Sequence, residues 1–213
     1  IFTYGLAFAN FGFMGNAVVM ALFEEIFFEY LIFTLPFWAM IYIWAVPTLL
    51  IPNENEKQTI KTRLKSFLNP MFIAMCIGAL IGIFNIKVPK FLKDVIDISG
   101  SCMSPVAMLL TGITVSVMDA RKTFLDYKLY LVSFIRLIVI PIIFIFIARQ
   151  LNFSPVVFCC ALCSMAMPLG LNTIVVPSAY GKDTSKATGM AVISHLISVI
   201  TIPIIFSMVN LTV

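Results

Sequence analysis

The chain has 213 residues, of which 61% are hydrophobic and 11% are charged, and its mean hydropathy is +1.06. Soluble domains carry about twice that share of charged residues, so the composition excludes an ordinary soluble protein and a disordered one. The sequence therefore predicts an all-α polytopic membrane protein in a lipid bilayer. The net charge of +4 is small and predicts no nucleic-acid partner.

Seven apolar segments are long enough to cross a bilayer, which takes about 20 residues of helix. In chain order they cover about 2–23, 27–51, 67–84, 95–118, 127–148, 155–180 and 186–209. The chain opens at Ile1 within apolar sequence, with no basic leader and no cleavage site. We therefore predict no signal peptide here and interpret the chain as part of a longer protein.

The first segment is interrupted at mid-length by glycine and asparagine. The interruption reads Asn10-Phe11-Gly12-Phe13-Met14-Gly15-Asn16. Backbone that leaves a helix at membrane depth needs partners from protein, a polar cavity or a bound solute. Asn10 and Asn16 could supply amide donors or carbonyl acceptors to a substrate or ion. Gly12 and Gly15 are expected to act through backbone freedom rather than contact.

The sixth segment carries a second interruption, Met167-Pro168-Leu169-Gly170-Leu171-Asn172. Pro168 lacks a backbone donor and is expected to leave a carbonyl free, and Gly170 is expected to provide backbone freedom. Asn172 is predicted to contact substrate or ion directly. A half-helix N-terminus carries about half a positive charge, so two such ends meeting would suit a carboxylate.

Two ionisable residues lie deep within predicted spans. Arg136 lies about 13 Å into its helix at ~1.5 Å per residue, close to mid-membrane, and we predict that it attracts an anion. Snorkelling and pairing with an acid outside this chain are the alternatives. His195 is the single histidine. It is a candidate for proton coupling, and a packed imidazole is the alternative reading. No acid lies centrally in any span, which favours an anionic substrate.

Basic residues predict the orientation of the chain. The loops at 52–66, 119–128 and 181–186 carry nine Lys and Arg residues, whereas the opposite loops carry four. By the positive-inside rule the richer loops face the cytoplasm and the C-terminus lies outside. We predict a multi-pass protein of the cell membrane, either the inner or the plasma membrane.

The order of segments predicts an inverted repeat. A broken helix followed by a proline-bearing helix occurs in the first two segments and again in the last two. The offset of five is odd, so corresponding helices cross the membrane in opposite directions. Residues 1–51 would be the last two helices of a first repeat, 52–66 a cytoplasmic linker, and 67–213 a complete five-helix repeat. Three N-terminal helices would precede this chain, giving seven of ten.

Taken together, these stretches resemble the auxin efflux carrier family, within the bile-acid/arsenite/auxin transporter superfamily. The similarity includes both interruptions and the stretches Asn69-Pro70, Ser104-Pro105-Val106-Ala107-Met108-Leu109-Leu110-Thr111-Gly112 and Ser198-Val199-Ile200-Thr201-Ile202-Pro203. The resemblance implies ten helices in two inverted repeats, with two broken helices that cross near the midplane. The short linker resembles that of bacterial malate or malonate permeases.

The predicted function is secondary active transport of a small organic anion, such as a dicarboxylate, by alternating access around the two breaks. The coupling ion would be H⁺ or Na⁺. A sodium-coupled symporter of the bile-acid type is the alternative. An intramembrane enzyme is a more remote one, because it would need a nucleophile and base or metal ligands at depth. We predict no catalytic residue, no metal site and no cofactor, and the sequence leaves a homodimer open.

Overall fold

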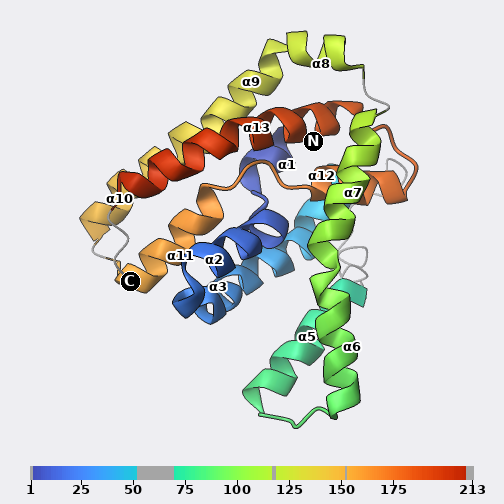
Figure 1. Ribbon diagram of the computed structural model, residues 1–213, viewed down its shortest axis with the longest axis vertical. Coiled ribbons are helices and arrows are strands. Elements are labelled where there is room, and N and C mark those ends of the chain that lie inside the picture. Colours follow the sequence, from blue (N-terminus) through green and yellow to red (C-terminus); the bar gives the residue numbers. More distant parts are fainter. Residues whose placement is uncertain (1, 52–69, 117–118, 152, 210–213) are drawn as a thin grey trace.

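The computed structural model describes residues 2–51, 70–116, 119–151 and 153–209, which fold into helices joined by short connections (Figure 1). The elements are α1 (Phe2–Ala7), η1 (Phe11–Gly15), α2 (Asn16–Leu22), η2 (Glu24–Ile26), α3 (Phe27–Met40), η3 (Ile41–Leu50), α5 (Pro70–Ile83), α6 (Lys90–Ser101), α7 (Met103–Ser116), α8 (Ala120–Leu125), α9 (Tyr127–Phe134), η4 (Ile135–Val139), α10 (Ile140–Leu151), α11 (Pro155–Met165), α12 (Asn172–Ala179) and α13 (Ser185–Ser207). The predicted linker 52–66 and Asn69 lie outside the described residues.

Three helices within this part of the chain are long and apolar enough to cross a membrane. They cover Glu24–Leu50, Tyr127–Leu151 and Ser185–Ser207. The other four predicted spans are interrupted or shorter in the described residues, because the first and sixth are broken and the fourth is divided in two. The architecture is that of an all-α membrane protein.

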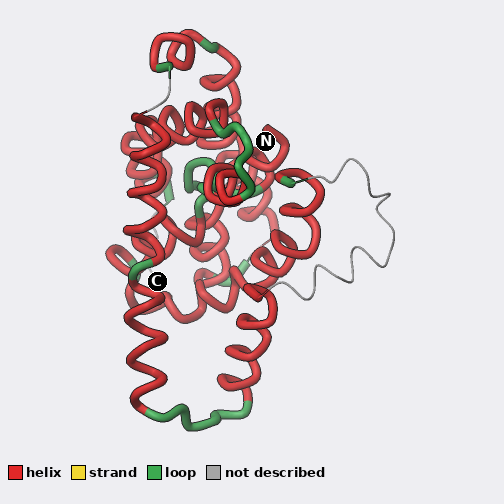
Figure 2. Tube along the Cα trace, turned by 90° about the vertical axis from the view of Figure 1, so that its right-hand side faces the viewer, coloured by secondary structure: helices red, strands yellow, loops and turns green. Residues whose placement is uncertain are grey.

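The fourth predicted span, 95–118, differs from the structure in its start and its continuity. α6 begins earlier, at Lys90, after Pro89 at the N-cap, and ends at Ser101. α7 then starts at Met103. The early start reflects the polar first turns of α6, whose charged side chains are exposed and need no apolar surroundings. α5 and α6 form a hairpin that projects from the rest of the molecule in both views (Figures 1 and 2).

The predicted loop 119–128 contains a short helix. α8 covers Ala120–Leu125, and α9 follows with Asp126 as its N-cap, whose carboxylate accepts from the Lys128 N–H over 3.0 Å. Lysine and arginine are good helix formers, so a basic stretch beside a cap can continue as helix. The basic residues at this end therefore lie on helix rather than in a loop.

Two long helices are wound more loosely over part of their length. η3 is π-helical over Ile41–Leu50 and contains Pro47, whereas η4 is π-helical over Ile135–Val139 and contains Arg136. Proline disturbs the regular hydrogen-bond ladder, which accounts for the first of these. No proline lies within η4, and π-helical turns are frequent at functional sites.

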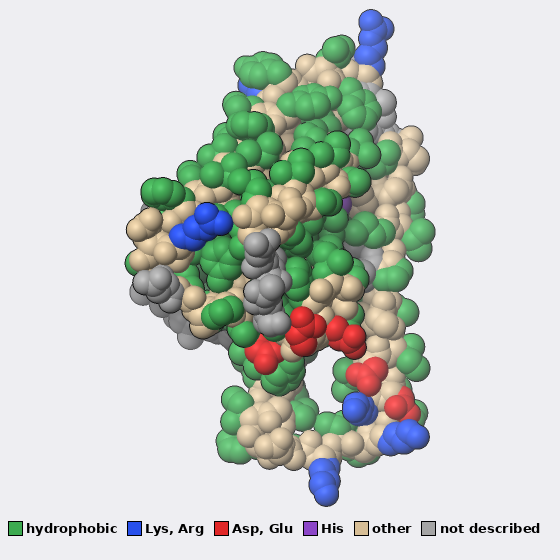
Figure 3. All heavy atoms as spheres, turned by 60° about the vertical axis from the view of Figure 1, so that its left-hand side comes forward, with side chains coloured by type: hydrophobic (Ala, Val, Ile, Leu, Met, Phe, Trp, Pro, Cys, Tyr) green, Lys and Arg blue, Asp and Glu red, His purple; other side chains and the backbone are tan. Residues whose placement is uncertain are grey.

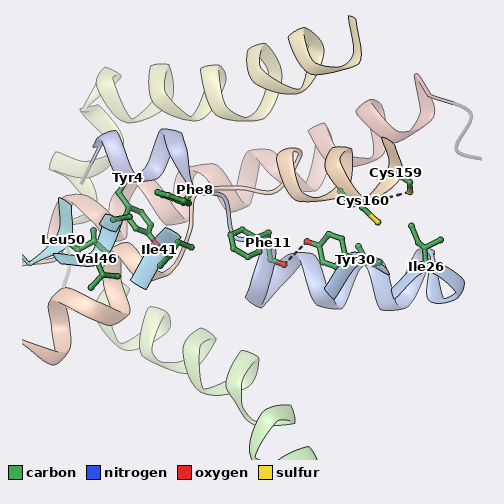
Figure 4. Packing of buried hydrophobic residues seen from close by; sticks show 13 residues of the cluster. Tyr4, Phe8, Phe11, Ile26, Tyr30, Ile41, Val46, Leu50, Cys159 and Cys160 are labelled. Carbon is green, nitrogen blue, oxygen red and sulfur yellow. Dashed lines mark hydrogen bonds between the residues drawn. The ribbon is translucent and has the colours of Figure 1, made fainter. Parts of the chain in front are cut away.

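The largest buried cluster joins α1, η1, α3, η3 and α11 (Figure 4). Tyr30 is fully buried, and its hydroxyl donates to the carbonyl oxygen of Phe11 over 2.9 Å. Phe11 also packs edge-on against Phe37 and Trp38 of α3, with ring centroids 5.8 and 5.1 Å apart. α3 therefore supports the helix that begins directly after the first break.

We expect Tyr30→Phe to weaken this support modestly. The change removes one buried hydrogen bond to Phe11, which should lower the free energy of unfolding by about 0.5–1.5 kcal/mol. Thermal unfolding in detergent would measure the loss. Tyr130→Phe is a matched control, since Tyr130 is 41% exposed on α9. Equal effects of the two changes would contradict the role given to the Tyr30 hydroxyl.

Gly12 and Gly15 serve close packing in this cluster. A Cβ added at Gly12 would collide with the Trp38 ring, and one at Gly15 would collide with the Tyr30 hydroxyl. Neither glycine has positive φ. The prediction that these two residues act through backbone freedom is therefore wrong; they are small because α3 lies directly against them.

Hydrophobic side chains cover most of the visible surface in Figure 3, and the acidic side chains on this face gather in its lower part. Large apolar residues are exposed along the long helices, for example Phe146, which is 70% exposed, and Val199, which is 69% exposed. Such surface would be unfavourable in water, whereas a bilayer solvates it.

Candidate functional site

The two broken segments meet backbone to backbone. The Asn10 N–H donates to the carbonyl of Pro168 over 2.8 Å, and the Gly170 N–H donates to the carbonyl of Phe8 over 3.3 Å. These bonds flank an isolated antiparallel bridge, Ala9–Leu169. They satisfy backbone groups that the breaks release from the helices. The structure confirms that both segments are discontinuous and that they approach one another.

The first break lies earlier in the chain than Gly12 and Gly15, where the sequence predicted it. α1 ends at Ala7 and helix resumes at Phe11, so Gly12 and Gly15 are helical. Asn10 is outside the helical region, with φ −80° and ψ 46°. The backbone of residues 8–10 pairs with residues 168–170 instead of continuing the helix. The break is therefore placed by this pairing and not by glycine.

Pro168 and Gly170 both act through the backbone. The Pro168 carbonyl accepts the Asn10 N–H, so this residue takes part in the contact between the two segments through its backbone. A Cβ at Gly170 would lie 3.0 Å from the Phe8 carbonyl oxygen and 3.2 Å from that of Ala9. Only glycine lets the two chains approach this closely without displacing either backbone.

Asn172 begins α12 directly after the second break. Its side chain is 7% exposed, and Nδ2 donates to the Tyr4 hydroxyl oxygen of α1 over 3.1 Å. Within the described part of the chain this is its one side-chain hydrogen bond. The N–H groups of Thr173 and Ile174 bond back to Gly170 and Leu171. α12 therefore offers a ligand its dipole and the Asn172 amide rather than a row of free N–H groups.

A cavity of about 830 Å³ lies beside the crossing. Asn16 and Asn172 line it, together with Ser99 and a mainly apolar wall. Its volume falls within the range of about 300–1,000 Å³ that is usual for small-molecule sites. Two of the asparagines singled out in the sequence therefore share one cavity, one from each broken segment.

The described walls of this cavity are largely apolar and include four aromatic residues. Trp38 and Tyr42 stack with centroids 5.8 Å apart and rings inclined by 11°. Phe13 and Tyr180 line the cavity as well. No described lining residue carries a charge. Polar recognition within this part of the cavity therefore depends on amides, hydroxyls and helix dipoles.

Buried Asn10 and partly buried His195 form a pair outside the cavity lining. His195 Nδ1 lies 2.7 Å from the Ala191 carbonyl oxygen, which can only accept, so Nδ1 carries the proton. Nε2 of the neutral ring then accepts from Asn10 Nδ2 over 3.0 Å. Asn10 is 1% exposed, and its Oδ1 has no hydrogen-bond partner in the described residues.

Arg136 is the one buried charged residue in the described part of the chain, at 4% exposure. Its Nη1 donates to the Leu6 carbonyl of α1 over 3.1 Å, and its Nε has no partner there. In an unbroken helix Leu6 would accept from the Asn10 N–H, which instead bonds Pro168. Arg136 thus satisfies a carbonyl that the first break leaves unpaired, and its positive charge suits the C-terminal end of a helix.

A family model described as membrane transport protein matches residues 1–206 of the chain. The chain belongs to this family. The match confirms the resemblance to auxin efflux carriers, so the protein is a membrane transporter with a small-molecule substrate. No curated protein and no solved structure is detectably similar to it.

The candidate residues with polar side chains fall into three places. Asn16 and Asn172 line the cavity. Asn10 pairs with His195, and Arg136 binds the end of α1. Sequence reasoning missed the aromatic wall, above all Trp38 and Tyr42. In a chain with 20 Phe, 6 Tyr and 2 Trp, aromatic residues alone give no signal, and only their shared cavity sets these apart.

Proposed function

We propose that the protein is a secondary transporter of a small organic anion, with alternating access around the crossing of the two broken segments. The observation that carries this is the cavity beside the crossing, lined by Asn16 and Asn172. The N-terminus of α12 adds a favourable dipole for a carboxylate. The described residues bury no acidic side chain, which supports an anion over a cation.

The uncharged lining favours a solute with one carboxylate and an apolar body over a solute with two. A second carboxylate in an apolar, cation-free wall would be desolvated without compensation. A dicarboxylate such as malate or malonate stays a proposal that would need a cationic group from outside the described residues. The sodium-coupled alternative differs from this proposal in the transported ligand and in the coupling ion. Proton coupling through His195 would favour the first, whereas a sodium site would favour the second. The cell-membrane location, the external C-terminus and the inverted repeat remain predictions.

The test of the site is Asn172. We expect Asn172→Ala to lower substrate affinity about tenfold, because it removes a polar ligand worth about 0.5–1.5 kcal/mol, and more if the partner is charged. Uptake of labelled monocarboxylates and dicarboxylates into proteoliposomes containing the full-length protein would measure it. Ser178→Ala, on the same helix and outside the cavity lining, is the matched control.

Asn172→Asp separates an anionic ligand from a cationic one. A new carboxylate should repel an anion and weaken its binding further than alanine does. Tighter binding of Na⁺ or of a cationic solute in this variant would contradict the proposed substrate charge. Wild-type binding by Asn172→Ala would move the substrate site away from α12.

A further inference from the structure

We infer that Asn10 and His195 form a proton-sensitive pair, in which charging of His195 reverses the Asn10 amide at the crossing. The inference rests on the proposed function for its transport consequence, although the pair itself is a feature of the structure. The imidazole of His195 and the backbone of Asn10 are each held by a further hydrogen bond. Ala191 O binds His195 Nδ1 over 2.7 Å, and Pro168 O binds the Asn10 N–H over 2.8 Å.

Protonation changes what the imidazole can bind. The neutral ring accepts from Asn10 Nδ2, but the imidazolium donates from both nitrogens. Nε2–H would then face the Asn10 NH₂ group, donor against donor. Rotation of the amide by a half turn brings Oδ1, which has no partner in the described residues, to Nε2–H. The added proton comes from solvent, and no other covalent bond changes.

The amide is placed to transmit this change to the crossing. Asn10 precedes the helix Phe11–Leu22, and its backbone carbonyl accepts from the Gly15 N–H over 2.9 Å. Phe13 of that helix lines the cavity and packs in one cluster with Leu171 and Ala191. One layer of side chains therefore joins the cavity to the turn of α13 that holds His195.

Among the described residues, the helices packed against α13 offer a charged His195 no counter-ion. The helices packed against it are α7, α8, α9, α12 and η4. Their described residues carry Arg136 on η4, Arg121 on α8, and Lys128, Tyr127 and Tyr130 on α9, but no carboxylate. α13 itself adds Lys186 near its N-terminus, and α1 adds Tyr4. An anion bound in the cavity, one layer of side chains away, would attract an imidazolium here, so proton and anion should bind together.

Nitrogen NMR tests the pair without transport. His195 is the single histidine of the 213 residues, so ¹⁵N-histidine labelling reports on it through its own signal. We expect a neutral ring with the proton on Nδ1 at high pH. Asn10→Asp places a carboxylate at Nε2, which should move the imidazole titration midpoint upward by about one pH unit or more. Thr201→Val, a buried change two turns further along α13, should leave the midpoint in place.

A proton on Nε2 in the neutral state, or the same midpoint in Asn10→Asp and wild type, would overturn the inference. Should Asn10→Asp fail to fold, two other measurements decide the matter. They are the tautomer of His195 in the wild-type protein and the ¹⁵N signal of the imidazole in Asn10→Leu. The imidazole signal of Asn10→Leu should lose its Nε2 hydrogen-bond shift. Retention of that shift would show that Asn10 is not the partner.

Transport then tests the coupling. In proteoliposomes with full-length protein, His195→Gln should take up no more substrate with a pH gradient than without one, while equilibrium exchange continues. Thr201→Val should keep the wild-type response to the gradient. A gradient response that survives in His195→Gln would contradict coupling through this residue. Absence of any organic-anion transport in wild type would refute the proposed function, yet it would leave the NMR result on the pair standing.

Discussion

Replacing Gly170 with valine is expected to prevent the two broken segments from pairing. A Cβ at this position would lie 3.0 Å from the Phe8 carbonyl oxygen, and that oxygen belongs to backbone that accepts the Gly170 N–H. The atoms that such a Cβ would press on are backbone atoms of the paired segments, so the added volume strains the bonds between residues 8–10 and 168–170. Overpacking of a buried site costs about 1–3 kcal/mol, and the lost backbone bonds add to that.

We therefore expect Gly170→Val to yield little folded protein in detergent, measured by size-exclusion profile and thermal unfolding. Gly100→Val is the matched control, because a Cβ at Gly100 meets nothing within 4 Å in the described residues. A Gly170→Val protein that folds and unfolds like the control would show that the close approach of the two breaks is dispensable.

Replacing Arg136 with methionine is expected to lower transport by more than an order of magnitude. The change leaves the Leu6 carbonyl without its partner, at a cost of about 1–3 kcal/mol for a buried unsatisfied group. That cost applies to α1, whose Tyr4 hydroxyl accepts from Asn172. Displacement of α1 should therefore disturb the cavity without any direct contact between Arg136 and substrate.

Arg136→Lys separates this positioning role from direct anion binding. The structure shows a single bond from Nη1 to Leu6, which a lysine ammonium can supply, so lysine should restore much of the transport that methionine loses. A lysine variant as impaired as methionine would indicate a bidentate carboxylate contact instead. Arg149→Met, at an exposed arginine with a 3.4 Å bond to the Met208 carbonyl, is the control.

Composition and hydrophobic pattern were sufficient to predict the membrane class and the helical fold. Apolar runs near the length of a bilayer have few alternatives, since lipid admits only structures whose backbone groups are satisfied internally. The same constraint made the two interruptions informative, because a break at that depth must find partners. Pro168 lies within the second break, but proline alone does not end a helix in this protein, since Pro36 lies within α3 and Pro203 lies within α13.

The exact place of the first break was decided by tertiary structure. Asn10-Phe11-Gly12 predicts irregular backbone around the glycines, yet helix resumes at Phe11. Glycine permits a break without requiring one, and the chain leaves the helix where backbone on another segment offers hydrogen bonds, at residues 8–10. Gly12 is needed instead by Trp38, a residue 26 positions away that no local pattern connects to it.

The partners of the polar residues were likewise beyond the sequence. Asn10, Arg136 and His195 are conspicuous in apolar segments because buried polar groups need compensation. Local sequence does not reveal that Asn10 meets an imidazole 185 residues away, or that Arg136 replaces a backbone donor lost at Leu6. Residue type determines which bonds a side chain can form. Only the packing of distant segments decides which group becomes its partner.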